Sequence, residues 1–434
     1  MNPRKATASV SYNGKNIDTK LASYLQSFNY TDIASGESDS LSLVVNDRDR
    51  KWIKGWFPSK GDTLSASILM YNWTKEGDTQ KLSCGSFVID DFSFSGTPIK
   101  LKLEAVAVPA STSFKETQRT KTYEKTTLAN IGTEIAGRAG VKFYYEAPTV
   151  YLEKVEQSEK DDCSFLNELV KLYGFAMKIY KNKIVIFQEV TYEKKKSVAT
   201  LTESDIEPNW SWNTTLAKTY TGAKYEYTNS DKNQTFSIIV GGGKRILKVT
   251  DAASTLAEAE RITLAKLNDA NKNDTTMSVT LSRANRKIIA TSCVTIKGLG
   301  KLDGKYYVEK VDWSLGGDST KQKLELRKVQ TRFTSANKMA TDVQKESATE
   351  TASSTTPTTD TGTTEQTPVK GGKWTLTVTK KGYYTAAEAL AGQATAGHPT
   401  GTRRPGTYTI FNISQGMLNL TTKPGVPGSW VNPN

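Results

Sequence analysis

The sequence predicts a mainly β protein with an α+β insert, followed by a linker and a small β-rich C-terminal module. Three observations support this prediction. Several segments alternate apolar and polar residues with a period of two, which is typical of half-buried antiparallel strands. Apolar residues recur at helical spacing mostly in the middle of the chain. A single stretch rich in Ser and Thr separates the last part of the 434 residues from the rest.

Residues 1–112 are predicted to form a first β domain, either a barrel or a sandwich. Apolar and polar residues alternate in three segments of this region, Ser40–Val45, Ser86–Phe94 and Ile99–Val106. In the third segment the aliphatic side chains share one face and the charged ones share the other. The apolar face is therefore expected to cover a core.

Residues 113–200 are predicted to form a small α+β domain. Apolar spacing over residues 128–135 predicts a helix, and Gly140 is placed to end it. Asp161 or Asp162 can cap a second helix with a wide apolar face.

Residues 201–333 are predicted to form a second β domain that contains one helix. Thr255 and Glu258 have the spacing of a capping box and predict where that helix begins. The strands expected after the helix are Met277–Leu281, Ser292–Ile296, Lys305–Val311 and Lys323–Val329.

A linker is predicted over residues 334–368, with a helical start near Ser335–Lys345. Within it, Thr351–Thr364 has ten Ser or Thr among fourteen residues and no large apolar side chain. Such a segment cannot bury enough surface to offset its chain entropy. Residues 369–434 are therefore expected to form a separate, mobile module.

The net charge of +13 is unevenly distributed. Residues 369–434 carry +6, residues 334–368 carry −3, and residues 1–333 carry the remaining +10. A basic chain can contact nucleic acid or acidic cell-wall polymers, and it can also have a solvated surface without a specific partner.

Few residues of this chain suit catalysis or metal binding. The single histidine, His398, lies in the C-terminal module, so the preceding domains cannot form a Ser-His-Asp or Cys-His arrangement. Three widely spaced cysteines favour neither a disulfide framework nor a zinc site. We therefore predict no catalytic, cofactor-binding or metal-binding residues and no cofactor. No secretory signal or membrane-spanning segment is visible, so membrane insertion is not expected.

The order of several segments resembles phage tail baseplate hub proteins, the late control protein D-like family of contractile tails. The first domain of that family is similar to Gly36–Leu41, Asp47–Asp49, Lys51–Ile53, Pro58–Asp62, Gly85–Asp90 and Ser95–Pro98. The middle and third domains are similar to Gln157–Leu166, Leu172–Phe175, Thr255–Leu267, Gly298–Val311 and Leu324–Lys328.

This resemblance implies a structural protein and not an enzyme. It implies two tail-tube-like β-barrel domains in each subunit and a homotrimer that forms a ring around the central channel. The ring would adapt the sixfold tail tube to the threefold spike. The implied partners are the tail tube protein, the central spike and baseplate wedge proteins. The implied location is the tail baseplate of a virion or tailocin made in the bacterial host cytoplasm.

Large aromatic residues are the candidate anchors of the domain cores or of the ring interfaces. Interface centres are rich in aromatic side chains, but so are ordinary cores. Both alternatives stay open at this stage for Trp52, Trp56, Phe57, Trp210, Trp212 and Trp313.

The C-terminal module resembles small modules of Gram-positive phage lysins and tail proteins. The residues that carry this resemblance are Tyr383–Ala389, Pro405–Asn412, Gly416–Thr421 and Pro427–Pro433. The resemblance implies a Gram-positive host and binding to the bacterial cell wall. The alternative is that the aromatic residues only form the core of the module. The candidate surface-binding residues are Arg403, Arg404, Lys423, Tyr408 and Trp430.

Two other function classes compete with a structural hub. One is a cell-wall-degrading or wall-binding tail enzyme that uses the C-terminal module for targeting, since a two-carboxylate mechanism needs no histidine. The other is a DNA-binding protein. Sequence-specific nucleic-acid binding is not expected, because basic residues alternate with acidic ones along most of the chain instead of gathering on one face.

Overall fold

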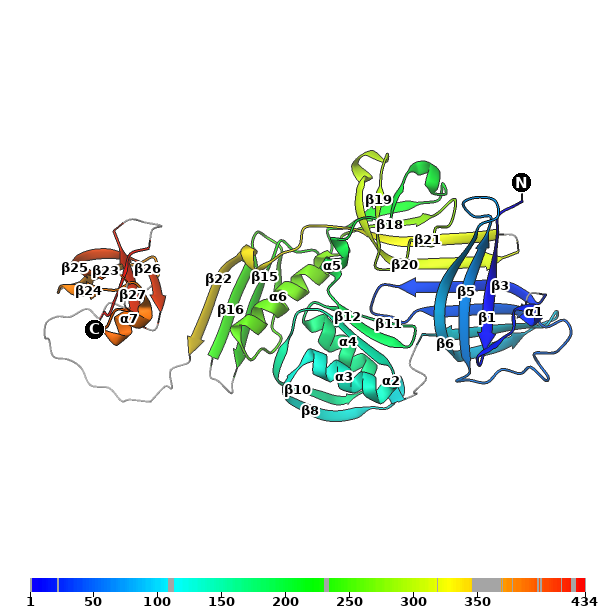
Figure 1. The fold of residues 1–434 in the computed structure, drawn as a ribbon, viewed down its shortest axis with the longest axis horizontal. Coiled ribbons are helices and arrows are strands. Elements are labelled where there is room, and N and C mark those ends of the chain that lie inside the picture. The colour runs from blue at the N-terminus through cyan, green and yellow to red at the C-terminus, as the bar shows by residue number, and fades with distance from the viewer. Residues whose placement is uncertain are drawn as a thin grey trace. The chain divides into compact units, whose positions relative to one another are not determined.

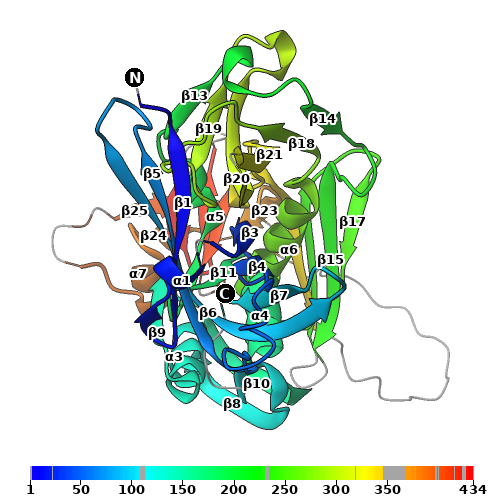
Figure 2. The same cartoon turned by 90° about the vertical axis from the view of Figure 1, so that its right-hand side faces the viewer.

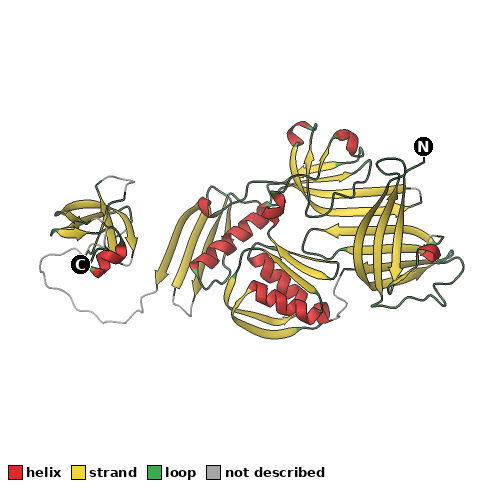
Figure 3. Ribbon diagram, in the orientation of Figure 1, coloured by secondary structure: helices red, strands yellow, loops and turns green. Residues whose placement is uncertain are grey.

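The structure is a computed structural model of the chain. It describes residues 2–21, 23–107, 113–229, 234–317, 319–345, 368, 370–376, 378–395, 398, 400–414, 416–422 and 427–433. The chain divides into two compact units, Met1–Ala348 and Thr349–Asn434, and each is described by itself. The predicted mainly β class with a few helices is confirmed (Figures 1 and 3).

The larger unit contains a sheet of thirteen strands. We call this sheet and its loops the sheet lobe. Its N-terminal strands are β1 (Lys5–Tyr12), β2 (Lys15–Asn16), β3 (Leu25–Ile33), β4 (Ser40–Asn46), β5 (Thr63–Tyr71), β6 (Thr79–Ser95) and β7 (Lys100–Val106). Its C-terminal strands are β13 (Ala199–Leu201), β14 (Ser211–Thr214), β18 (Thr275–Thr280), β19 (Cys293–Ile296), β20 (Gly304–Gly316) and β21 (Ser319–Lys328). A one-turn helix, α1 (Asp18–Leu21), and two short 3-10 helices, η1 (Glu203–Asp205) and η2 (Gly300–Leu302), lie in the loops of this lobe.

The two groups of strands meet where β3 pairs antiparallel with β20. The register runs from Phe28 opposite Leu315 to Ile33 opposite Lys310. Figure 1 shows β20 and β21 lying beside β3, although these strands come from opposite ends of the unit. The alternating burial of β3, β4 and β7 places their apolar side chains in one core, which also contains Trp313 from β20.

No closed barrel is detected among the described residues. The resemblance implied two barrels in each subunit, and the structure has one continuous sheet instead. The sheet is continuous because the thirteen residues of β20 pair with strands of both groups. The first part of β20 pairs with β19 and the second part pairs with β3. The C-terminal strands and the N-terminal strands are therefore hydrogen-bonded into one sheet. Figure 2 shows β1 beside β5, and the strand order places β5, β1 and β2 at the end of the sheet opposite β14.

A second body, which we call the mixed lobe, begins with the predicted α+β segment. Its elements there are α2 (Ser113–Glu116), β8 (Arg119–Thr127), α3 (Leu128–Ala139), β9 (Lys142–Glu146), β10 (Tyr151–Lys160), α4 (Asp162–Leu172), β11 (Ala176–Tyr180) and β12 (Lys183–Phe187). A short helix, α5 (Glu189–Glu193), leads from β12 to the sheet lobe. Both predicted helices are present: Gly140 ends α3 with φ of 68°, and the Asp161 side chain caps α4 by accepting from the Ser164 N–H.

Part of the predicted second β domain belongs to the mixed lobe. A separate four-stranded sheet is formed by β15 (Gly222–Asn229), β16 (Gln234–Gly241), β17 (Ile246–Val249) and β22 (Lys338–Lys345). Helix α6 (Leu256–Asn271) begins at the predicted cap Thr255 and packs on β15 and β16. Buried residues of this sheet and of α6 share one core with α3 and α4, so residues 201–333 do not form a single β domain.

The helical start expected near Ser335–Lys345 is wrong. A single 3-10 turn, η3 (Ser335–Asn337), is followed by strand β22, which pairs antiparallel with β16. The open edge of β16 supplies backbone hydrogen-bond partners for this stretch, and these outweigh a weak local helix preference. The linker prediction otherwise falls mainly on residues 346–367, which lie outside the described residues.

The smaller unit is β-rich. A four-stranded sheet is formed by β23 (Lys373–Leu376), β26 (Gly406–Ser414), β27 (Met417–Thr421) and β28 (Ser429–Val431). A strand pair, β24 (Lys380–Gly382) and β25 (Gly401–Arg403), and the helix α7 (Ala386–Ala391) complete it. The four-stranded sheet contributes one core cluster, which consists of Leu376, Ile410, Leu418, Leu420 and Val431.

Candidate functional site

A buried ionic cluster, which we call the lysine junction, joins the mixed lobe to the sheet lobe. Lys178 extends from β11, and its Nζ lies 2.6 Å from Asp32 Oδ1 of β3 and 2.8 Å from Asp39 Oδ1. Lys178 Nζ also donates to the Ile33 carbonyl. The Asp32 carboxylate accepts from the Ala290 N–H at 2.9 Å, and the Asp39 carboxylate accepts from the Ile33 N–H at 3.0 Å. All three charged side chains are buried.

The two carboxylates and the ammonium of the lysine junction affect one another. Burial raises the pKa of Asp39 to about 6, and the neighbouring Asp32 adds to this rise while Lys178 opposes it. Burial alone would lower the pKa of Lys178, but the charges of Asp32 and Asp39 raise it. Lys178 therefore stays charged at neutral pH, and Asp39 is the group that takes up a proton in mild acid.

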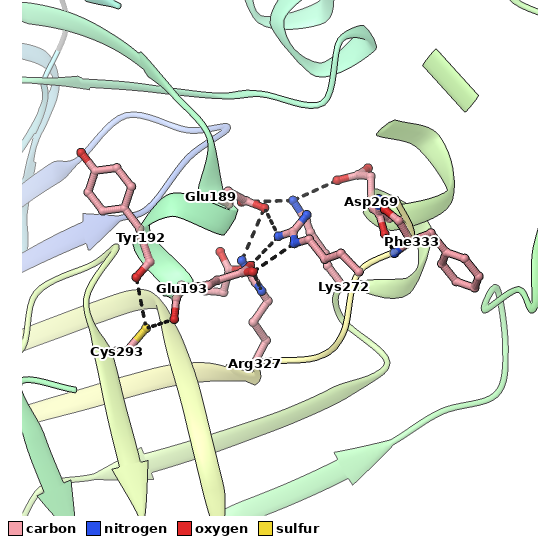
Figure 4. A network of polar contacts seen from close by, with 11 residues as sticks. Glu189, Tyr192, Glu193, Asp269, Lys272, Cys293, Arg327 and Phe333 are labelled. Carbon is pink, nitrogen blue, oxygen red and sulfur yellow. Dashed lines mark hydrogen bonds and ion pairs between the residues drawn. The ribbon is translucent and has the colours of Figure 1, made fainter. Parts of the chain in front are cut away.

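A second cluster, the arginine junction, lies where α5, α6 and the sheet lobe meet (Figure 4). Arg327 of β21 is 2% exposed, and its Nη1 lies 2.7 Å from Glu193 Oε1 of α5. Its Nε pairs with Glu309 of β20, and its Nη2 lies 3.4 Å from Glu189 Oε2. The guanidinium thus contacts three carboxylates from two different elements.

Two further cations complete the arginine junction. Arg332 Nη2 lies 3.1 Å from Glu189 Oε2 and also pairs with Glu193. Lys272, at the C-terminal end of α6, lies with its Nζ 3.4 Å from Glu189 Oε1. The Asn268 side chain ties α6 to the same loop by bonding both the N–H and the carbonyl of Phe333, at 2.8 and 2.9 Å.

Opposite charges face one another within the arginine junction, and Lys272 Nζ also lies 2.9 Å from Asp269 Oδ1. Burial would raise the pKa of Glu189 and of Glu193, but the surrounding cations lower both. For Glu309 burial dominates and raises the pKa, despite the attraction of Arg327. Breaking such a buried pair by removing one partner is strongly destabilising, because the other charge is left buried without compensation. We interpret both junctions as structural connections between the lobes.

The sequence analysis missed both junctions. For Lys178 the sequence does contain an indication of a buried charge, because this lysine lies between apolar residues in the strand Ala176–Tyr180. The structure buries it with them. A charged side chain in such a strand needs a partner, because burying an isolated charge is costly. The identity of the partners, Asp32 and Asp39, could not be inferred, since they lie 146 and 139 residues away in the sequence.

The six candidate anchors do not form one surface. Trp52 and Trp313 are 4% and 1% exposed and belong to the core of the sheet lobe. The half-buried residues Trp56, Trp210 and Trp212 pack against the same core. Phe57 is 55% exposed and is the anchor that keeps the most surface for a partner.

Four of the five candidate surface-binding residues of the C-terminal module lie near one another, either in direct contact or through a neighbouring residue. Arg403 lies with its guanidinium 5.8 Å from the Tyr408 ring centroid, and the Tyr408 hydroxyl donates to the Arg404 carbonyl at 2.9 Å. Arg403 also donates to the Ser429 hydroxyl at 3.2 Å, next to the half-buried Trp430. Lys423 lies outside the described residues.

The described part of the chain offers no cluster of three or more His, Cys, Asp or Glu residues that could hold a metal ion. None of its described helices is long and apolar enough to span a membrane.

The fold resembles that of known tail proteins. One is the tail protein from Neisseria meningitidis MC58, with a TM-score of 0.57, 13% identity and coverage of 75% of this chain and 97% of that chain. Another is the 43 kDa tail protein of prophage MuSo2 from Shewanella oneidensis, with a TM-score of 0.53, 11% identity and the same coverages of 75% and 97%. No family model and no curated protein matches the sequence. At these identities the likeness concerns the fold, and the predicted resemblance to tail proteins is confirmed at that level.

Replacing Asp39 by Asn is expected to change how stability depends on pH. Because the folded-state pKa of Asp39 is raised to about 6, the ionised carboxylate disfavours the folded state. The stability of the natural protein relative to Asp39→Asn should therefore fall as the pH rises from about 4 to about 6, by roughly 3 kcal/mol, and stay constant above that. Urea unfolding at a series of pH values measures this difference.

The matched control for this experiment is Asp90→Asn, at an exposed carboxylate of β6. Its stability difference from the natural protein should change little over the same pH range. If the stability difference between the natural protein and Asp39→Asn also stays constant over this pH range, the raised pKa of Asp39 is contradicted.

Proposed function

We propose that the chain is the structural hub of a phage tail or phage-tail-like particle. In this proposal three copies form a ring that adapts the sixfold tail tube to the threefold spike and encloses the central channel. The ring is located in the tail baseplate, where its partners are the tube protein, the spike and the baseplate wedge proteins. The role is an assembly role without enzymatic activity.

The observation that carries this proposal is the continuous sheet with two groups of strands, in a fold shared with two tail proteins. Each chain contributes an N-terminal group and a C-terminal group, joined by the β3–β20 pair. Three copies would supply six groups of strands, the number of subunits that a sixfold tube presents at its end. A threefold spike would in turn meet three identical subunits.

A channel needs a polar wall, and the alternation of the strands is suited to one. Along β4, β5 and β7 every second residue is buried in the core, while the residues between are exposed or half-buried. The exposed face carries side chains such as Lys100 and Lys102, which water solvates readily.

The assembled particle tests the proposed copy number. We expect a density map of the intact particle to show three copies of this chain in the ring between the tube and the spike. The physical reason is that each copy already supplies two groups of strands. A map with six copies in that ring would contradict the proposal, whereas a monomer in dilute solution would not, because ring contacts depend on concentration.

For the C-terminal module we propose binding to the Gram-positive cell wall through its basic and aromatic residues. The full chain is expected to bind purified cell walls at low salt and to bind less at high salt, because exposed charges are screened over ~10 Å at 0.1 M ionic strength. Arg403→Ala combined with Arg404→Ala should weaken binding at low salt, as measured by sedimentation with the walls.

The matched control removes the same charge from exposed positions of the larger unit, by Lys287→Ala combined with Lys301→Ala. This control should bind nearly as well as the natural chain. Strong binding that neither salt nor the double arginine variant reduces would rule out the electrostatic mechanism.

A further inference from the structure

The loop between β4 and β5, residues 47–62, exposes an aromatic surface. We call it the aromatic loop. Phe57 is 55% exposed and Ile53 is 41% exposed. The Phe57 ring is stacked on Phe94 with centroids 5.5 Å apart and meets the Phe92 ring edge-on at 5.5 Å, and both partners belong to β6. Apolar side chains thus gather at one place on the surface of the sheet lobe.

The aromatic loop is held in shape from beneath. The Asp47 side chain is fully buried, and its carboxylate accepts from the N–H groups of Trp52 at 3.0 Å and of Ile53 at 2.9 Å. The Trp52 ring packs edge-on against Trp56 with centroids 5.6 Å apart. Because these contacts fix the loop in the free protein, little conformational entropy remains to be lost when a partner covers Phe57.

The same loop carries exposed positive charge. Within the part of the chain that the structure describes, the exposed side chains of Arg48, Arg50, Lys54 and Lys60 form no ion pair, and the Arg48 guanidinium lies 5.5 Å from the Tyr24 ring centroid. The acidic residues of the loop are already engaged. Asp47 caps the loop from inside, Asp49 contacts Tyr24 and Lys51, and Asp62 accepts from Asn13 at 2.9 Å.

We propose that the aromatic loop is the docking site for a different protein of the particle, whose surface offers an apolar recess surrounded by carboxylates. This inference rests on the proposed function, since it names a contact within the same assembly. Phe57 and Ile53 enter the recess, and the four cations meet the carboxylates around it. Aromatic residues and arginine are the residue types that contribute most to binding at interface centres.

Charge argues against a second copy of this chain as the occupant. Two copies that met through the aromatic loop would bring eight loop cations together against only four exposed carboxylates of β6, those of Asp90 and Asp91, and residues 1–333 carry a net charge of +10. A nucleic acid fits less well, because bases stack on free aromatic faces. Here one face of Phe57 is covered by Phe94, and the rings pack on one another.

Photo-crosslinking in the assembled particle tests this proposal. The full chain is produced with Phe57→p-benzoylphenylalanine in cells that make the particle, and the purified particle is irradiated and analysed by mass spectrometry. The expected result is a cross-link to one peptide of a different protein, with Asp or Glu residues beside aliphatic ones. A cross-link to this chain itself or to DNA, or no cross-link at all, would overturn the proposal.

Two comparisons make the result specific. Tyr151→p-benzoylphenylalanine, at a side chain of β10 that is 79% exposed, should not yield the same peptide. Adding Arg48→Ala and Arg50→Ala to the Phe57 variant should lower the cross-link yield severalfold, whereas adding Lys301→Ala at an exposed residue of the sheet lobe should not. An equal yield in the arginine variant would overturn the role of the cations.

The same experiment separates the failure of this inference from that of the proposed function. If the chain is absent from purified particles, the hub proposal fails. If the chain is present but residue 57 yields no cross-link to another protein, the hub proposal stands and the docking site is wrong.

Discussion

The pairing of β3 with β20 is the constraint on which the rest of the larger unit depends. It joins strands whose facing residues are far apart in the chain: the Thr31 hydroxyl donates to Asp312 Oδ1 at 2.7 Å across 281 residues of sequence. Through this pair, Phe28 and Trp313 enter one core, and the C-terminal strands extend the N-terminal ones. Closing so long a loop costs chain entropy, and burial of large aromatic side chains, each worth about 2–3 kcal/mol, offsets that cost.

Both ionic junctions use strands of this sheet. Asp32 of β3 meets Lys178 of the mixed lobe. Glu309 of β20 pairs within the sheet lobe with Arg327 of β21, and Arg327 also meets Glu189 and Glu193 of α5. Buried ion pairs are directional, and they contribute less to stability than an equal area of apolar packing. Their role is consistent with fixing the orientation of one lobe on the other, which the proposed ring would require of each subunit.

Local elements could be predicted from the sequence, but long-range pairings could not. Helices α3, α4 and α6 followed from apolar spacing and from caps such as Asp161 and Thr255, which act over a few residues. The β3–β20 pair has no local signature, because any half-buried strand can pair with another. For the same reason, the transfer of β15–β17 to the mixed lobe and the pairing of β22 with β16 were not foreseen. Among the aromatic residues, sequence alone could not separate the buried Trp52 from the exposed Phe57 five positions later.

Hydrogen exchange of the native protein tests most directly whether the two groups of strands form one unit. The amides to follow are those of β3 and β20 across the pairing from Phe28–Ile33 to Lys310–Leu315, compared with the cores of β5 and β21. If the sheet is one cooperative structure, all these amides should share a single, high free energy of opening. Rapid exchange in β3 and β20 alone, with β5 and β21 still protected, would show that the two groups are separate domains in loose contact and would contradict this account.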